Sequence, residues 1–170
     1  MNRLALDGLE LRPGERVLEI GFGGGALLRA MRECGAEVVG ADLSEAAVER
    51  SRAQGLETVL ASVEALPFAS ASFDKAVSVN SLYFWPDAQA AFGELARVLR
   101  PGGRLVLCFE PADELRKWPG HRHGFRLFEP REVRYLMASA GFASIEEAWG
   151  TGRKPDLFCR LSATREGANG

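Results

Sequence analysis

Long apolar runs are missing from this chain, and so is any large excess of charge of one sign. No apolar stretch approaches the ~20 residues that a membrane-spanning helix needs. The 21 Lys and Arg residues nearly balance the 23 Asp and Glu residues, for a formal net charge of −2, so we expect no general attraction to nucleic-acid phosphate or anionic membrane. Residues 1–4 lead into no apolar signal-peptide core. We therefore expect a cytoplasmic protein that binds neither nucleic acid nor membrane.

Cysteine and histidine are also scarce. Cys34, Cys108 and Cys159 are far apart and show no C-x-x-C spacing, which argues against a zinc site or a disulfide framework and for reduced thiols. The two histidines, His121 and His123, have no third ligand nearby in the sequence, so we expect no metal site. The pair is a candidate base or anion-binding patch near neutral pH, and a solvated loop is the alternative.

The most informative segment is rich in glycine. Residues 16–20 form a short apolar run of strand type, residues 21–25 read G-F-G-G-G, and residues 26–31 begin a helix. Glycine permits a tight turn and the close approach of a ligand. The first N–H groups of a helix are unpaired and carry a partial positive charge. This order of elements predicts a cradle for a nucleotide-like cofactor, with a purely structural turn as the alternative.

An acidic residue follows at the spacing that such a cradle requires. The strand-type segment 37–41 ends in Asp42, which lies 21 positions after Gly21. An acid about 20 residues beyond the first glycine is placed to accept hydrogen bonds from ribose hydroxyls. The other role open to Asp42 is to cap the next helix, for which Ser44 is the better candidate. The two roles are compatible.

Strand-type and helix-type segments alternate along the chain, which is typical of a parallel sheet with helices on both faces. The expected strands are residues 16–20, 37–41, 57–60, 75–79, 104–109, 144–148 and 157–162. The expected helices are residues 4–11, 26–33, 45–54, 88–99 and 129–140. Because no repeat or linker interrupts this pattern, we expect a single domain over residues 1–163. Residues 164–170 are small, polar and glycine-containing, so we expect a disordered tail there.

Four ordered motifs resemble the class I S-adenosylmethionine (SAM)-dependent methyltransferases. The pattern E-x-G-x-G-x-G at 19–25 is similar to their first motif, and A-S-V-E-A-L-P-F at 61–68 to the segment after their third strand. F-D-K-A-V at 73–77 resembles their fourth strand, and residues 94–105 the helix, turn and strand that follow. The four motifs resemble those of the small-molecule branch of this family, which includes ubiquinone and menaquinone biosynthesis methyltransferases. The resemblance implies SAM as cofactor and a Rossmann-like, doubly wound α/β fold, with a mostly parallel seven-stranded sheet and an antiparallel last strand.

The resemblance also implies where SAM would be held. Glu19 helps to hold the ammonium of its methionine end, Asp42 accepts hydrogen bonds from the ribose, and Leu43 packs against adenine. Many relatives carry an Asp where this chain has Ser62, which can still accept a hydrogen bond from the adenine amino group but without charge assistance. The expected cofactor-binding residues are Glu19, Gly21, Phe22, Gly23, Gly25, Asp42, Leu43, Ser62, Val63 and Asn80.

Methyl transfer from a sulfonium depends on positioning and on the exclusion of water, so the lack of a catalytic triad does not argue against an enzyme. Side chains that contact the methyl acceptor are expected in loops at the same end of the sheet. The aromatic turn at 83–85 is either a packed lid or a substrate contact. Glu110 is either a base or an exposed loop acid. The candidate catalytic residues are Asn80, Tyr83, Glu110, His121 and His123.

The sequence therefore predicts a SAM-dependent methyltransferase with a small organic acceptor. The alternative is a SAM-binding sensor or partner subunit without methyltransferase activity of its own. A NAD-type oxidoreductase would need a recognisable catalytic pair, such as a tyrosine and a lysine at helical spacing. Neither Tyr83 nor Tyr135 is followed by a lysine three or four residues later, so this class of enzyme is disfavoured. Three arrangements of the acceptor site are possible. The site is either open to solvent, or covered by the 4–11 helix and the 118–128 loop, or completed by another subunit. The third arrangement keeps a homo-oligomer among the alternatives.

Overall fold

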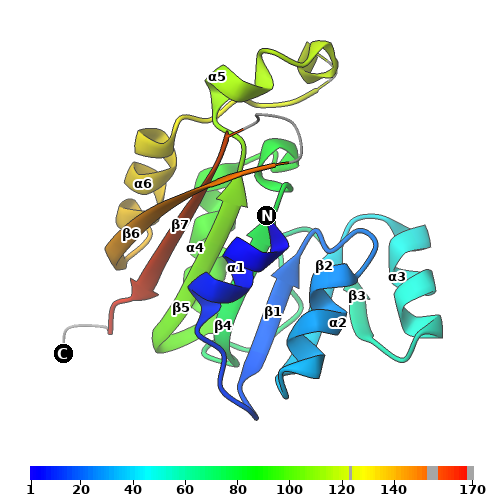
Figure 1. Cartoon of the computed structure of the whole chain (residues 1–170). Coiled ribbons are helices and arrows are strands. Elements are labelled where there is room, and N and C mark those ends of the chain that lie inside the picture. Colours follow the sequence, from blue (N-terminus) through cyan, green and yellow to red (C-terminus); the bar gives the residue numbers. More distant parts are fainter. Residues whose placement is uncertain (123, 153–156, 168–170) are drawn as a thin grey trace.

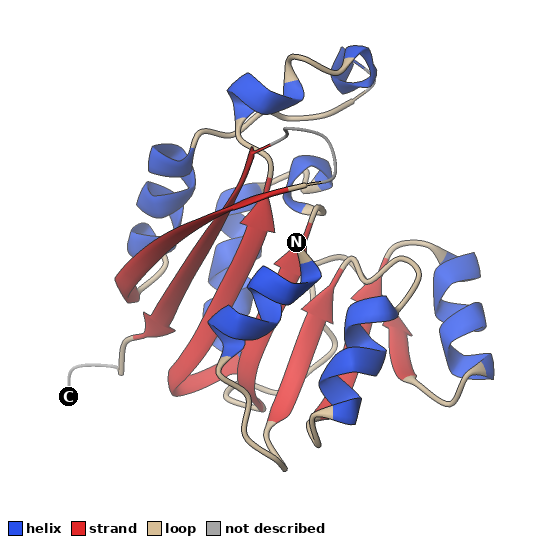
Figure 2. Ribbon diagram, viewed as in Figure 1, coloured by secondary structure: helices blue, strands red, loops and turns tan. Residues whose placement is uncertain are grey.

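The computed structural model describes residues 1–122, 124–152 and 157–167, in which helices and strands alternate (Figure 2). The strands are β1 (Arg16–Ile20), β2 (Glu37–Asp42), β3 (Glu57–Leu60), β4 (Phe73–Val79), β5 (Leu99–Phe109), β6 (Phe142–Thr151) and β7 (Leu157–Arg165). The α-helices are α1 (Asn2–Leu9), α2 (Ala26–Glu33), α3 (Glu45–Ala53), α4 (Ala88–Val98), α5 (Ala112–Leu115) and α6 (Pro130–Ser139). Two short 3-10 helices are η1 (Leu82–Phe84) and η2 (Pro119–Arg122).

The strands form one sheet in the order β3-β2-β1-β4-β5-β7-β6. β1 to β5 run parallel, and β7 pairs antiparallel with both β5 and β6. The chain first adds β2 and β3 on one side of β1 and then returns to place β4 on the other side. The strand order therefore reverses between β1 and β4, which is where open α/β sheets bind ligands. This topology confirms the predicted fold class.

Helices cover both faces of the sheet (Figure 1). α1, α2 and α3 pack on one face, in a cluster with Val17 and Val38, whereas α4 and α6 pack on the other, in a cluster with Leu18 and Val39. Consecutive strand residues point to opposite faces, so a strand buried on both sides reads as a continuous apolar run. That is why β1 and β2 lack the polar alternation of a half-exposed strand. None of the described helices combines the length and apolar character that a bilayer crossing requires.

Most predicted elements are confirmed, and the bounds of β1, α2 and β3 agree fully. Strand β5 begins at Leu99 rather than at Arg104, because Leu99 pairs with Phe73 across an irregularity in the ladder. The predicted tail starts too early: Thr164 pairs with Arg104, so β7 continues where we expected disorder. The last part of that predicted tail, residues 168–170, lies outside the described residues.

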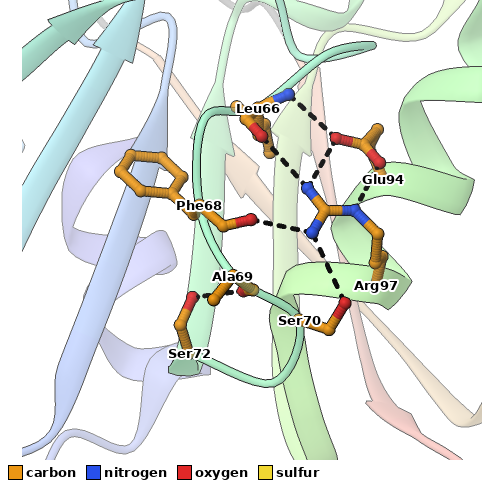
Figure 3. Close-up of polar contacts among 7 residues, drawn as sticks. All are labelled: Leu66, Phe68, Ala69, Ser70, Ser72, Glu94 and Arg97. Carbon is orange, nitrogen blue, oxygen red and sulfur yellow. Dashed lines mark hydrogen bonds and ion pairs between the residues drawn. The ribbon is translucent and has the colours of Figure 1, made fainter.

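The β3–β4 loop, which follows the third strand, is held by one arginine of α4 (Figure 3). The Arg97 guanidinium donates to the carbonyl oxygens of Phe68 at 2.7 Å and of Leu66 at 3.0 Å. It also pairs with the Glu94 carboxylate at 2.6 Å, and Glu94 accepts the Leu66 N–H at 2.8 Å. A planar fork with several fixed donors is needed to make these bonds together. The pair therefore fixes the loop that leads away from Val63.

We expect Arg97→Lys to lower the free energy of unfolding by about 1–2 kcal/mol, because a lysine ammonium cannot reach both carbonyls and Glu94 together. The matched control is Arg100→Lys, since Arg100 is half-exposed and its ion pair with Asp74, at 2.7 Å, needs only one donor. That control is expected to cost less than about 0.5 kcal/mol. Urea unfolding of the two variants and the parent chain measures the difference. Equal losses in both variants would contradict the special role of Arg97.

Candidate active site

A cavity of about 460 Å³ opens at the carboxyl ends of β1, β2 and β4, beside the reversal of strand order. Five of the predicted cofactor-binding residues line it, namely Gly21, Asp42, Leu43, Val63 and Asn80. The other lining residues are Ile20, Ala41, Ser44, Ala61, Ser81, Phe84 and Trp85. Four separate loops therefore meet here, although more than 60 residues separate the first from the last.

The residues of the predicted glycine-rich loop have different roles in the structure. Gly21 has a left-handed backbone (φ 68°), and an added Cβ would clash with the side chain of Ser81, so this glycine lets two loops approach each other. The Phe22 ring is buried against Gly40, where a Cβ would clash with it. Phe22 is thus a core side chain that offers only its backbone to a ligand. Gly25 is the N-cap residue of α2.

Asp42 ties the glycine-rich loop to the β2–α3 turn. Its Oδ2 accepts the Gly23 N–H at 2.9 Å, and its Oδ1 accepts the Ser44 N–H at 2.9 Å. Ser44 itself caps α3, since its side chain accepts the Ala47 N–H at 3.2 Å, as the sequence suggested. A carboxylate has about four acceptor positions, so each Asp42 oxygen keeps one for a ligand hydroxyl. Asp42 can therefore hold the loop and a ribose at the same time.

Glu19 is a carboxyl group in the core. It is 4% exposed on β1, and its Oε2 has no hydrogen-bond partner among the described residues. Burial raises the pKa of Glu19 to about 8; the Leu28 N–H, which lowers it, and the Asp42 charge, which raises it, contribute less. A buried acid without a counter-charge holds its proton. A cation brought close to Oε2 would favour the ionised form, which fits the role that the sequence assigns to Glu19.

Two apolar residues that line the cavity are exposed, and a third is buried. Leu43 is 65% exposed and Phe84 is 53% exposed, which is unusual for large apolar side chains unless they face a ligand or partner. Val63 is 5% exposed and lines the same cavity. Ser62 does not line it: its Oγ accepts the Glu64 N–H at 3.4 Å within the turn. Adenine contact is therefore better supported for Val63 than for Ser62.

A second cavity, of about 500 Å³, adjoins the first. The two share Asn80 and Phe84, so a ligand in one would meet a ligand in the other at these side chains. The remaining lining residues of the second cavity are Tyr83, Glu110, Glu114, Leu115, Lys117, Trp118 and Phe125. Helix α1 contributes no residue to either lining, whereas Trp118 and Phe125 of the predicted covering loop line the second cavity.

Tyr83 links the loops after β4 and β5. Its hydroxyl donates to Asn80 Oδ1 at 3.0 Å and accepts the Glu110 N–H at 2.5 Å. Burial, above all, raises the pKa of Tyr83. The hydroxyl is thus neither a ready base nor a free donor, and a catalytic role for Tyr83 stays a prediction. Because Asn80 Oδ1 is engaged, the amide nitrogen of Asn80 is its remaining polar group.

Two further side chains of the site were missed from the sequence. Ser81 Oγ lies 2.6 Å from Ser78 Oγ, accepts the Trp85 indole N–H at 3.2 Å, and lies 3.3 Å from the Ile20 carbonyl oxygen. The Phe125 ring packs against Phe84 at a tilt of 57°, with 4.7 Å between ring centroids. Neither residue belongs to a motif, so only the fold brings them to the cavities.

The remaining candidates divide into three cases. Glu110 follows β5 and lines the second cavity, as expected for an acid at that strand end. His121 lies in η2, and His123 lies outside the described residues. Within the described part of the chain, no group of three or more His, Cys, Asp or Glu side chains is arranged to hold a metal ion.

The strand order, the glycine-rich loop after β1 and the acid that ends β2 define a class I SAM-dependent methyltransferase domain. The sequence profile described as "Methyltransferase domain" matches residues 18–107, which is more than half of the chain. The chain therefore belongs to this methyltransferase family, whose cofactor is SAM, and the predicted family is confirmed.

Individual relatives of this chain are also named as methyltransferases. An uncharacterized methyltransferase of Bacillus subtilis, YdaC, is 30% identical over 119 residues, which cover 66% of this chain and 66% of that protein. A ubiquinone biosynthesis O-methyltransferase of Hahella chejuensis is 38% identical over 115 residues, covering 62% of this chain and 48% of the relative. The chain thus spans less than two thirds of the length of either relative.

Among solved structures, the fold is similar to a methyltransferase in complex with the Haloferax volcanii Trm112 methyltransferase activator. The TM-score is 0.88 at 20% identity, and the match covers 97% of this chain and 88% of the other. At this identity the likeness shows the fold alone.

The site fits SAM on three observations. Asp42 keeps acceptor positions for a ribose, Leu43 offers an exposed apolar surface to a flat ring, and Glu19 presents an unpartnered buried oxygen for a cation. These are the features that the ribose, the adenine and the positively charged methionine end of SAM would need.

We expect Asp42→Ala to weaken SAM binding by about tenfold or more, because the change removes the hydrogen-bond acceptors for the ribose. The control is Glu45→Ala, which removes a nearby acid from the first turn of α3. Isothermal titration with SAM measures both affinities, and thermal unfolding checks that each variant is folded. An unchanged affinity in a folded Asp42→Ala protein would contradict the ribose contact.

A second prediction concerns pH. Glu19 keeps its proton in the folded state up to a pKa of about 8, whereas the unfolded chain loses it near 4.5. Between these values the folded state binds more protons, so the Glu19 contribution to the free energy of unfolding falls as pH rises from about 4.5 to about 8. Glu19→Gln removes the titrating group and keeps the shape.

We therefore expect Glu19→Gln to match the parent chain near pH 4.5 and to exceed its stability increasingly as the pH approaches 8. Urea unfolding of both proteins at several pH values without SAM measures this. Parallel stability curves would show that Glu19 ionises as easily in the folded state as in the unfolded one.

Proposed function

We propose that this chain binds SAM in the first cavity and transfers its methyl group to a small organic acceptor in the second. The observation that carries the proposal is that the two cavities meet at Asn80 and Phe84. A displacement reaction needs both reactants in contact and in line, which adjoining cavities allow. Similarity to a ubiquinone biosynthesis O-methyltransferase supports an acceptor of small size.

The proposed role of the protein is mainly positioning. When bound, SAM supplies a methyl carbon on a sulfonium: the acceptor lone pair forms the new bond, and the C–S electron pair stays on sulfur, giving S-adenosylhomocysteine. A proton released from the acceptor passes to water or to a carboxylate. The Asn80 amide nitrogen, oriented by Tyr83, donates toward the junction of the cavities, while Phe84 and Trp85 exclude water there.

Titration calorimetry with SAM, S-adenosylhomocysteine and NAD tests the first half of the proposal. We expect micromolar binding of the first two and none of NAD. Formation of S-adenosylhomocysteine with a broad panel of phenols, amines and thiols tests the second half. Binding without turnover on any acceptor would favour the alternative of a SAM-binding sensor or partner subunit. The absence of SAM binding would contradict both.

A further inference from the structure

We infer that the ring of Phe84 binds the positively charged sulfur of SAM, and that this contact lets the site distinguish SAM from S-adenosylhomocysteine, whose sulfur is uncharged. The inference rests on the proposed function for the place of the sulfur, at the junction of the two cavities. It rests on the side chains themselves for the chemistry of the contact.

The junction of the two cavities carries no charged side chain of its own. Of the described residues, Asn80 and Phe84 are the two that line both cavities, and neither is ionisable. Asp42 is the one charged residue in the described lining of the first cavity, and its proposed partner is the ribose. The acids of the second cavity, Glu110 and Glu114, do not line the first. A sulfonium at the junction would therefore meet no carboxylate on a residue that the cavities share.

An aromatic ring is the other group that attracts a cation. The ring face carries partial negative charge and is effective within about 6 Å of the centroid. Phe84 is 53% exposed, so much of its ring is open to a ligand. Trp85 is 5% exposed, meets the Phe92 ring edge-on at 5.6 Å, and lines the first cavity but not the second. Phe84 is therefore the better placed of the two rings.

The Phe84 ring is held in place without a ligand. Its N–H donates to the Ser81 carbonyl oxygen at 3.0 Å, which fixes the main chain of η1. The Phe125 centroid lies 4.7 Å from the Phe84 centroid at a tilt of 57°, and the Tyr83 centroid lies 6.2 Å away at 79°. A contact that is fixed before binding loses less conformational entropy when the cofactor arrives.

Methyl transfer would remove the charge that the ring binds. The C–S electron pair stays on sulfur, so the sulfonium of SAM becomes a neutral thioether in S-adenosylhomocysteine. The contact with Phe84 would thus favour SAM and weaken after transfer, which helps the exchange of product for new cofactor. Because the two ligands share adenine, ribose and the amino-acid end, the ratio of their affinities isolates the contact at sulfur.

Isothermal titration of SAM and of S-adenosylhomocysteine into the parent chain, Phe84→Leu and Phe84→Tyr tests the inference. Leucine keeps an apolar side chain without a ring face, whereas tyrosine keeps the face. We expect Phe84→Leu to lower the ratio of SAM affinity to S-adenosylhomocysteine affinity by about threefold or more, and Phe84→Tyr to keep the parent ratio. An unchanged ratio in folded Phe84→Leu protein would overturn the inference.

The matched control is Leu43→Ala. Leu43 is also a large exposed apolar residue that lines the first cavity, and it is expected to contact adenine. We expect this change to weaken both ligands by a similar factor and so to leave the ratio as it is in the parent chain. A ratio that falls equally in Leu43→Ala and Phe84→Leu would show that the preference does not belong to Phe84.

A replacement that conserves shape separates the charge of the ring face from its volume. Trifluorophenylalanine incorporated at position 84 alone keeps the size of the ring nearly unchanged but withdraws electron density from its face. We expect the affinity for SAM to fall by about threefold, while the affinity for S-adenosylhomocysteine does not fall. Equal changes in the two affinities, or none, would overturn the inference even if Phe84→Leu does not fold.

The proposed function fails separately from this inference. If neither ligand binds the parent chain, both are overturned. If both ligands bind and the ratio of their affinities does not depend on the ring at position 84, the inference alone is overturned.

Discussion

The reversal of strand order between β1 and β4 is the constraint on which the site depends. Crossover helices leave the carboxyl ends of these neighbouring strands in opposite directions, to opposite faces of the sheet. Among the described residues, none from helices α2, α3 or α4 lines the first cavity, which the loops after β1, β2 and β4 surround instead. The apolar burial that sets the strand order thereby also sets the place of the first cavity.

Within that space, side chains bonded to main chain hold the loops together. Asp42 joins the glycine-rich loop to the β2–α3 turn, and Tyr83 joins the loop after β4 to the end of β5. Arg97 fixes the loop after β3 in the same way. At each of these positions the same hydrogen bonds stabilise the fold and hold the loops around the cavity. A substitution there would therefore change both the stability of the protein and the shape of the cavity.

The sequence predicted the sheet well because β1 and β2 are apolar runs between clear turn signals, and Gly21, Asp42 and Val63 reach the cavity as their motifs suggested. It failed where long-range packing decides. No local pattern shows that the Phe22 ring packs on Gly40 or that the Tyr83 hydroxyl is used up between two loops. The second cavity lay furthest from prediction, because Phe125 contacts Phe84 and Trp118 only through the fold.

The central claim is that the first cavity is the SAM site, and a crystal structure with S-adenosylhomocysteine tests it most directly. The account predicts both ribose hydroxyls within about 3 Å of the Asp42 carboxylate, adenine between Leu43 and Val63, and the sulfur facing Asn80 at the junction of the two cavities. Ligand bound elsewhere, or bound here with the ribose away from Asp42, would contradict the account.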